Sequence, residues 1–287
     1  MRSPWSSVPA QASSRAAART SAPAEAHPPA ALPGRVAGYR AVRRLGSGRG
    51  CDVLLGYSER GDTAALKVFG PDVSVARVER EVRALSAGRA GTVPGLPTLL
   101  DVASLPDGGT CLILERLEGE SLARYLLGCA TLLLPGEAVT ILAPLLATLS
   151  GLHEVGFVHT ELSLATVLVD LSGRPVLLGL GALNELTDAA PDRIRLLRDD
   201  YARVERLVRG TLEGLDPSIP SAREAEHIVA RCAAAAAASP FRSCLPQLEQ
   251  MLFDWAAAVP LHPGVAPPRT TQRQSASVVV TGEPTGV

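Results

Sequence analysis

The chain has 287 residues, 46% of them apolar but only 3% aromatic, so it can bury a sizeable core dominated by aliphatic side chains. The net charge is −1, and residues 1–35 hold four arginines against one glutamate, which leaves the middle of the chain acidic. This argues against a nucleic-acid-binding domain, which needs a concentrated basic face. Five scattered cysteines without a CxxC pair indicate reduced thiols rather than a disulfide framework or a zinc site.

The two ends of the chain differ in composition from the rest. Residues 1–37 are rich in Ala, Pro, Ser and Arg, residues 259–287 are similar, and both are expected to be disordered tails. Residues 38–258 form one globular stretch without internal repeats. Its most apolar window, 131–152, is interrupted by two prolines and a glutamate, so we expect a buried helix and no membrane span. The N-terminus lacks the apolar run of a signal peptide, which favours a cytoplasmic protein.

The order of the predicted elements indicates the fold class. Short β-prone runs between glycine clusters come first, and helical periodicity dominates from residue 121 onward. The predicted strands are 39–45, 53–57, 63–69, 98–102, 111–114, 167–170 and 175–178. The predicted helices are 75–85, 121–128, 137–154, 198–213, 223–238 and 244–257. Strands followed by helices predict an α+β protein with an N-lobe at 38–117 and a C-lobe at 118–258.

A glycine-rich turn and one lysine point to a phosphate-binding site. The turn LGSGRG (45–50) separates the first two strands, and its glycines are Gly46, Gly48 and Gly50. Without a Cβ, such residues let backbone N–H groups approach phosphates, although a plain glycine-rich hairpin has the same pattern. Lys67 is the only lysine among 28 basic residues. A compact ammonium suits a gap between phosphates and a carboxylate, and Glu81 of the predicted helix can supply that carboxylate.

These features together resemble the small lobe of the eukaryotic-type Ser/Thr protein kinases. In that family a strand lysine grips the phosphates of ATP and a helix glutamate holds it; AALK (64–67) and Glu81 match those positions. The run LILERL (112–117) resembles the last strand and the hinge, which implies that Glu115 and Leu117 offer backbone groups to adenine. The apolar residues that match the family's adenine sandwich are Val53, Ala65 and Leu168.

The large lobe resembles the family in register but departs from it in chemistry. HTELSLAT (159–166) stands where the family has HRDLKPEN, and Gly179 opens the segment that matches DFG. Glu161 replaces the aspartate that accepts the substrate proton, and its extra methylene shifts the carboxylate by roughly 1 Å, which can cost about 10²-fold in rate. Thr166 and Gly179 replace the two side chains that hold Mg²⁺, whose charge stabilisation is the main part of phosphoryl transfer.

The segment after Gly179 is short. Only 17 residues separate Gly181 from Asp199, which resembles the aspartate that opens the family's central buried helix, and no APE-like sequence is present. The resemblance therefore implies a degenerate, bacterial member of the family with a shortened activation segment, that is, a pseudokinase.

Three hypotheses stay open for the function. The first is a pseudokinase that binds ATP without Mg²⁺ and serves as a signalling scaffold or allosteric regulator. The second is a weakly active Ser/Thr kinase that uses Glu161 as base. The third is a kinase-shaped protein that binds no nucleotide, in which Lys67 and Glu81 form a solvated structural pair worth about 0–1 kcal/mol.

The expected partners are other signalling proteins, with no nucleic acid. An active kinase could phosphorylate threonines of the C-terminal tail, which a phosphothreonine-binding domain could then read. A solvated tail without a partner is the alternative. The threonines concerned are Thr270, Thr271, Thr281 and Thr285.

Overall fold

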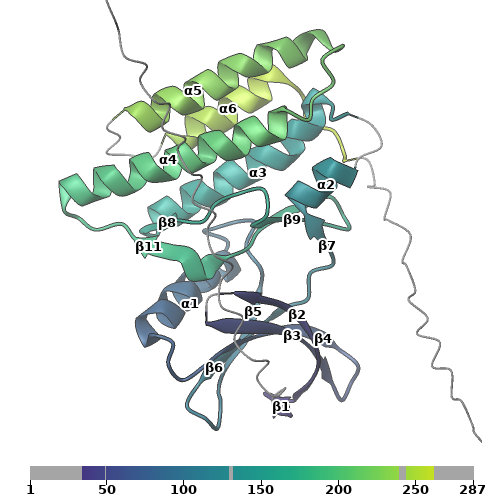
Figure 1. Ribbon diagram of the computed structural model, residues 1–287, viewed down its shortest axis with the longest axis vertical. Helices are drawn as coiled ribbons and strands as arrows, with labels where there is room; N and C mark the ends of the chain where they lie inside the picture. The colour runs from purple at the N-terminus through teal and green to yellow at the C-terminus, as the bar shows by residue number, and fades with distance from the viewer. Residues whose placement is uncertain (1–33, 49, 129–131, 239–243, 262–287) are drawn as a thin grey trace, which may run out of the picture. The chain divides into compact units, whose positions relative to one another are not determined.

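The computed structural model describes residues 34–48, 50–128, 132–238 and 244–261. Within these residues the chain folds into a β-rich small lobe followed by a helical large lobe (Figure 1). The predicted two-lobed α+β architecture is therefore confirmed. The tail threonines, by contrast, lie outside the described residues.

The small lobe is built on a six-stranded antiparallel sheet in the order β1-β2-β3-β4-β6-β5. Its strands are β1 (Arg35–Val36), β2 (Tyr39–Gly48), β3 (Cys51–Ser58), β4 (Thr63–Phe69), β5 (Leu99–Ser104) and β6 (Thr110–Glu115). Side chains alternate between the two faces of a strand. In β4, Leu66 therefore joins a small core on one face, whereas Phe69 joins the main core on the other. Lys67 points to the main-core side, toward the large lobe.

Helix α1 (Val75–Arg89) lies between this sheet and the large lobe (Figure 1). It packs against β5 on one side and against the segment 180–185 of the large lobe on the other. Its buried side chains include Val78, Glu81 and Leu85, which recur at helical spacing and lie on one face. Through α1, residues of the small lobe reach the region where the two lobes meet.

Five helices form most of the large lobe. They are α2 (Leu122–Gly128), α3 (Pro135–Glu154), α4 (Ala190–Leu212), α5 (Ala225–Ala237) and α6 (Leu245–Trp255). Helix α3 packs against α6, and α4 packs against α5. In the described part of the chain, α3 alone is long and apolar enough to cross a membrane, but 83% of its apolar window is buried inside the protein. It is the buried core helix that the sequence predicted.

Two small sheets lie between the helices and the small lobe (Figure 1). Strands β7 (Gly119–Ser121), β9 (Val167–Asp170) and β10 (Pro175–Leu177) form one, and β8 (Phe157–His159) pairs with β11 (Leu183–Glu185) in the other. The loop 160–166 joins β8 to β9, and residues 178–182 join β10 to β11. Both connections end up facing the small lobe, which places the predicted catalytic-loop residues there.

Each predicted tail includes, at its inner end, residues that the structure describes as part of the fold. Strand β1 pairs with β2 and buries Val36, so the ordered part begins before residue 38. At the other end, the C=O of Val259 accepts a hydrogen bond from Thr140 Oγ1 at 2.6 Å, and its N–H donates to the C=O of Gly136 at 3.2 Å. Local composition missed both segments because their order depends on partners distant in sequence.

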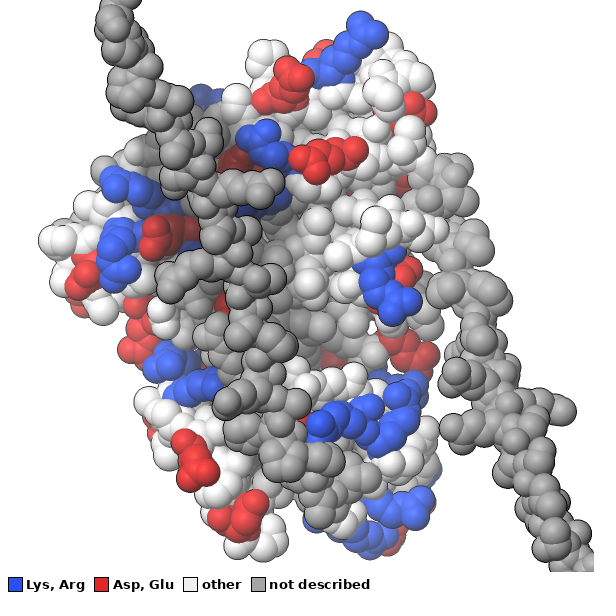
Figure 2. All heavy atoms as spheres, in the orientation of Figure 1, with Lys and Arg blue, Asp and Glu red and all other residues white. Residues whose placement is uncertain are grey.

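Charged side chains of both signs intermingle over the face shown in Figure 2. Arg44 and Asp52, and likewise Arg174 and Asp170, form ion pairs at the surface. Such mixed surfaces lack the concentrated positive potential that attracts a polyanion. That the chain does not bind nucleic acid stays a prediction.

Candidate functional site

Two adjoining cavities lie where the small lobe meets the large lobe. The first has a volume of about 390 Å³ and mostly apolar walls. The second, of about 340 Å³, is more polar and lies beside the hairpin that joins β2 to β3. Lys67 and Gly179 line both cavities, so the two are adjacent at these residues. A volume of several hundred Å³ is typical of small-molecule sites.

The apolar cavity has walls from both lobes. Val53 of β3 and Ala65 of β4 line it on the sheet side, and Leu168 of β9 lines it on the large-lobe side. Leu114, the register partner of Ala65, is buried and also lines it. Aliphatic walls on two opposite sides suit a flat aromatic ring, because they cover both of its apolar faces.

The hinge residues Glu115 and Leu117 line the same cavity. The N–H of Glu115 already donates to the C=O of Thr98 at 2.9 Å. Within the described part of the chain, no residue accepts a hydrogen bond from the N–H of Leu117. Leu117 therefore has a backbone donor left for a ligand, which is the role that the family resemblance implies.

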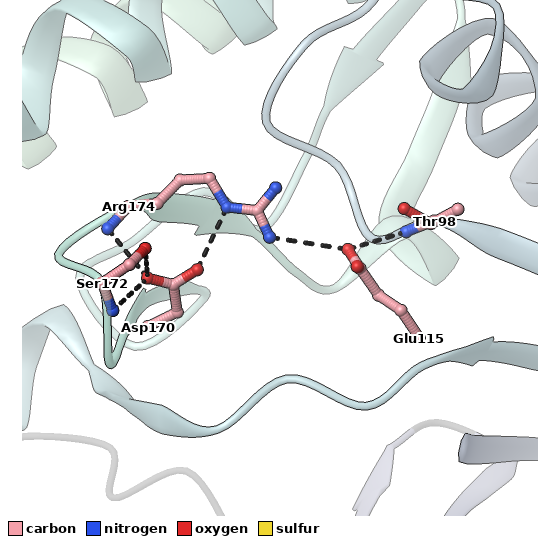
Figure 3. Close-up of polar contacts among 5 residues, drawn as sticks. All are labelled: Thr98, Glu115, Asp170, Ser172 and Arg174. Atoms are coloured by element: carbon pink, nitrogen blue, oxygen red, sulfur yellow. Dashed lines mark hydrogen bonds and ion pairs between the residues drawn. The ribbon is translucent and has the colours of Figure 1, made fainter. Parts of the chain in front are cut away.

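A polar network fixes the hinge to the turn between β9 and β10 (Figure 3). Nη2 of Arg174 lies 3.6 Å from Oε1 of Glu115, which also accepts a hydrogen bond from the N–H of Thr98 at 3.0 Å. Nε of Arg174 donates to Oδ2 of Asp170 at 3.1 Å, and Ser172 donates twice to Oδ1. Burial pushes the pKa of Asp170 upward, but these hydrogen bonds outweigh it and hold the pKa below its ordinary value.

Lys67 and Glu81 form a hydrogen-bonded ion pair between β4 and α1. The two residues are only 8% and 2% exposed. Nζ of Lys67 also lies 5.2 Å from the ring centroid of Phe69, and Oε2 of Glu81 has no hydrogen-bond partner among the described residues. The expectation of a solvated pair is wrong, because both side chains lie at the interface of the two lobes. Removing one partner of a buried pair costs about 3–5 kcal/mol, far more than at a surface.

The glycine-rich turn is a tight hairpin at the edge of both cavities. Strand β2 continues to Gly48 and β3 begins at Cys51, so the strands are longer than predicted. Gly50 has φ +66°, in the left-handed region that favours glycine. Gly46 lines the apolar cavity and Gly48 the polar one. Burial raises the pKa of the Cys51 thiol, which therefore stays protonated at neutral pH.

His159 at the end of β8 and Glu161 two residues later differ in environment, since the histidine is buried and the glutamate is exposed. His159 is fully buried and its Nε2 donates to the C=O of Leu178 at 3.0 Å. Burial lowers the pKa of His159, so the ring is neutral at pH 7. Glu161 is exposed and lines the polar cavity next to Thr160. Of these residues, Glu161 has the group and the position for proton transfer.

The two positions that would hold Mg²⁺ in an active kinase do not fit a metal. Oγ1 of Thr166 accepts from the N–H of Ser163 at 3.0 Å and donates to its C=O at 2.9 Å, so the hydroxyl is committed to the loop. Gly179, with φ +78°, has no side chain. Nowhere in the described residues do three or more His, Cys, Asp or Glu cluster closely enough to hold a metal. Mg²⁺ prefers near-octahedral oxygen ligands that include carboxylates, and neither Thr166 nor Gly179 supplies a carboxylate.

The segment that follows Gly179 is as short as the sequence implies. Leu183 of β11 pairs with His159 of β8, and the N–H of Leu186 donates to the C=O of Gly156 at 2.8 Å. Only residues 186–189 then separate β11 from α4. That the usual platform for a peptide substrate is absent here stays a prediction.

The start of α4 differs from the prediction. The helix begins at Ala190, eight residues before the predicted 198, and Ile194 and the buried Leu197 already stand at the helical spacing that leads to Tyr201. Arg195 lies within ion-pair distance of Asp192 and Asp199, which stabilises these turns locally. The buried aspartate is Asp200 rather than Asp199; its Oδ2 lies 2.7 Å from Nε2 of His153.

Sequence reasoning missed two residues of the polar cavity, Arg77 and Arg80 of α1. Their spacing could have indicated them, because Arg77 precedes Glu81 by one helical turn and so shares its face. In the sequence they are two of the charges between the apolar positions of the predicted helix. With Lys67 they make the cavity wall strongly basic.

Three solved structures of the Mycobacterium tuberculosis PknI kinase domain, one of them a cysteine-to-alanine mutant, share this fold. Each is 20% identical to this chain, with TM-scores of 0.57, 0.58 and 0.57. The alignments cover 79–80% of this chain and 99–100% of those domains. No family model matches the sequence, and no curated protein matches it significantly. The likeness shows a protein-kinase-like fold, as predicted.

Proposed function

We propose that this chain is a pseudokinase, which binds an adenine nucleotide without Mg²⁺ and acts as a signalling scaffold or allosteric regulator. The observation that carries the proposal is the contrast between the two cavities. The apolar one keeps aliphatic walls and the buried Lys67–Glu81 pair. At the polar end, neither Thr166 nor Gly179 offers a metal ligand. Binding and catalysis need different residues, and this contrast supports a protein that keeps the set for binding.

Each retained residue has a definite role in this proposal. The aliphatic walls cover the adenine faces, and the N–H of Leu117 hydrogen-bonds the adenine edge. Nζ of Lys67 contacts phosphate oxygens while Glu81 fixes its position. The hairpin glycines Gly46, Gly48 and Gly50 let the backbone approach the phosphates.

A second function, a weakly active Ser/Thr kinase, is favoured by one observation. Glu161 is exposed and lines the polar cavity, where it can accept a proton from a substrate hydroxyl. This function requires slow transfer of phosphate that depends on added metal. Glu161→Gln abolishes such transfer, whereas background hydrolysis would survive the substitution.

The partners that suit a regulator of this kind are other signalling proteins of the cytoplasm. One is an active kinase that phosphorylates the tail beyond residue 261, and another is a phosphothreonine-binding domain that reads the product. Phosphothreonine is recognised by clusters of arginines, so the recognising surface belongs to the partner. Mass spectrometry of the chain from its native cells tests this, because unmodified tail threonines would remove the basis for such a partner.

Calorimetric titration of the full-length chain with ATP tests the proposed function, first in EDTA and then in Mg²⁺. Ala65→Phe fills the apolar cavity and serves as the blocked variant, because Ala65 lines it and Phe is far larger. Binding in EDTA that Ala65→Phe removes supports the proposal. Binding that requires Mg²⁺ supports the weak kinase instead. No binding in either buffer leaves Lys67 and Glu81 as a structural pair and refutes both.

A further inference from the structure

The polar cavity is basic. Lys67, Arg77 and Arg80 line it, and Glu161 is the carboxylate among its described lining residues. Lys67 already forms an ion pair with Glu81, whereas the two arginines have no such carboxylate partner among the described residues. In the described part of the chain, no carboxylate lies within ion-pair distance of Arg77 or Arg80.

Arg77 is held at a defined place in this cavity. Its Nε donates to the C=O of Gly181 at 3.1 Å, which fixes the guanidinium against the segment after Gly179. Nη2 lies 2.7 Å from the position that a Cβ on Gly181 would occupy. Nη1 lies 3.8 Å from the position that a Cβ on Gly50 would occupy. The guanidinium therefore sits between the hairpin and the segment that would carry the main metal ligand of an active kinase. A side chain at position 181 would force the guanidinium to move.

Arg80 lies one turn further along the same helix and also lines the cavity. Its Nε is buried and has no hydrogen-bond partner among the described residues. A buried donor without an acceptor is costly, and the cost is largest for a charged group. An anion in the cavity would remove this cost.

We propose that Arg77 and Arg80 bind the β- and γ-phosphates of a nucleoside polyphosphate and thereby replace the metal ions that an active kinase uses there. This inference rests on the proposed function, since it assumes that the adenosine part occupies the neighbouring apolar cavity. Guanidinium groups match phosphate oxygens in geometry and stay charged at all physiological pH values. The two arginines also neutralise charge that Thr166 and Gly179 cannot neutralise through a metal.

Two consequences distinguish this site from a metal-dependent one. Affinity should rise steeply from adenosine to ADP to ATP in the absence of any divalent cation. Added Mg²⁺ should weaken the binding of ATP, because the ion competes with the guanidinium groups for the same oxygens and lowers the charge of the ligand.

The experiment compares adenosine, ADP and ATP by calorimetry on the full-length chain in EDTA. Arg77→Gln/Arg80→Gln should lower the affinity for ATP about 100-fold, since a hydrogen bond to a charged group accounts for roughly tenfold or more. Its affinity for adenosine should stay within about twofold, which also shows that the variant is folded. Arg83→Gln is the matched control: Arg83 is on the same helix but pairs with Glu185 outside the cavity, and ATP affinity should not change.

Arg80→Gln alone carries the test if the double variant fails to bind adenosine, because Nε of Arg80 has no hydrogen-bond partner among the described residues that the substitution would leave unpaired. It should lower ATP affinity about tenfold. ATP binding that is equal in wild type and both variants, or that Mg²⁺ strengthens, overturns the inference but leaves nucleotide binding intact. Failure of wild type to bind either adenosine or ATP refutes the proposed function itself.

Discussion

Lys67→Met should destabilise the protein strongly, because it leaves Glu81 as a buried carboxylate without a cation. Glu81 is 2% exposed, and its Oε2 already lacks a hydrogen-bond partner among the described residues. Breaking a buried pair in this way costs about 3–5 kcal/mol of the free energy of unfolding. For a domain of this size, that corresponds to a fall in Tm of roughly 6–20 °C.

Two further variants separate the charge from the packing. Lys67→Met/Glu81→Met replaces both charges by apolar chains of similar length and should recover most of the lost stability. Arg83→Met removes an exposed ion pair with Glu185 from the same helix, where the side chains are 57% and 51% exposed, and should cost at most about 1 kcal/mol. Urea unfolding followed by circular dichroism measures all four proteins without nucleotide.

The measured losses of stability show whether the buried charge of Glu81 or the packing of the Lys67 stem accounts for the effect. If Lys67→Met loses less than about 1 kcal/mol, Glu81 must reach water in solution, and the buried geometry would not describe the protein. A double variant no more stable than the single one would mean that packing of the lysine stem, rather than charge, accounts for the loss.

Three other predictions follow from titratable groups. The pKa of Asp170 lies below its ordinary 3.8, so its stabilising contribution is complete above that pH and is lost as the pH falls through the lower folded value; Asp170→Asn should lower stability at pH 6 and flatten the acid limb of a urea-unfolding series. Burial holds the pKa of His159 below 6.5, so the unfolded chain binds the extra proton, stability falls as the pH drops below 6.5, and His159→Gln should remove that slope. Burial raises the pKa of Cys111 and of Cys232 to about 12, so iodoacetamide at pH 8 should label them only after unfolding, as peptide mass spectrometry would show.

Much of the fold could be predicted, because the spacing of apolar residues and the positions of glycines along the chain indicate its elements. Helix α1 is indicated by apolar residues at helical spacing, and strands β3 and β4 by short β-prone runs between glycines. The order of strands and helices indicates two lobes. The predicted start of α4 is wrong, although Ile194 and the buried Leu197 stand at helical spacing before Tyr201 and could have indicated the earlier start. Strand β1 depends on pairing with β2, which composition does not reveal.

Some features of the candidate site could likewise be predicted from the sequence, whereas others could not. The single lysine and a glutamate fourteen residues later are visible in the sequence, as are the missing side chain at Gly179 and the changed residue at Thr166. The basic cavity is not visible, because Arg77 and Arg80 read as ordinary charges of an amphipathic helix. Only the packing of α1 against the segment 180–185 places the two arginines at the wall of a cavity.

The sequence by itself determined which chemical groups the protein has: one ammonium, a glycine-rich turn, aliphatic walls and no metal-binding side chain where an active kinase has two. The tertiary structure decided their environment. It buried the Lys67–Glu81 pair, committed the hydroxyl of Thr166 to its own loop, and placed two arginines in the polar cavity. The physical reason is that burial and pairing depend on residues that are distant along the chain, such as Arg77 and Gly181, whereas periodicity records only near neighbours.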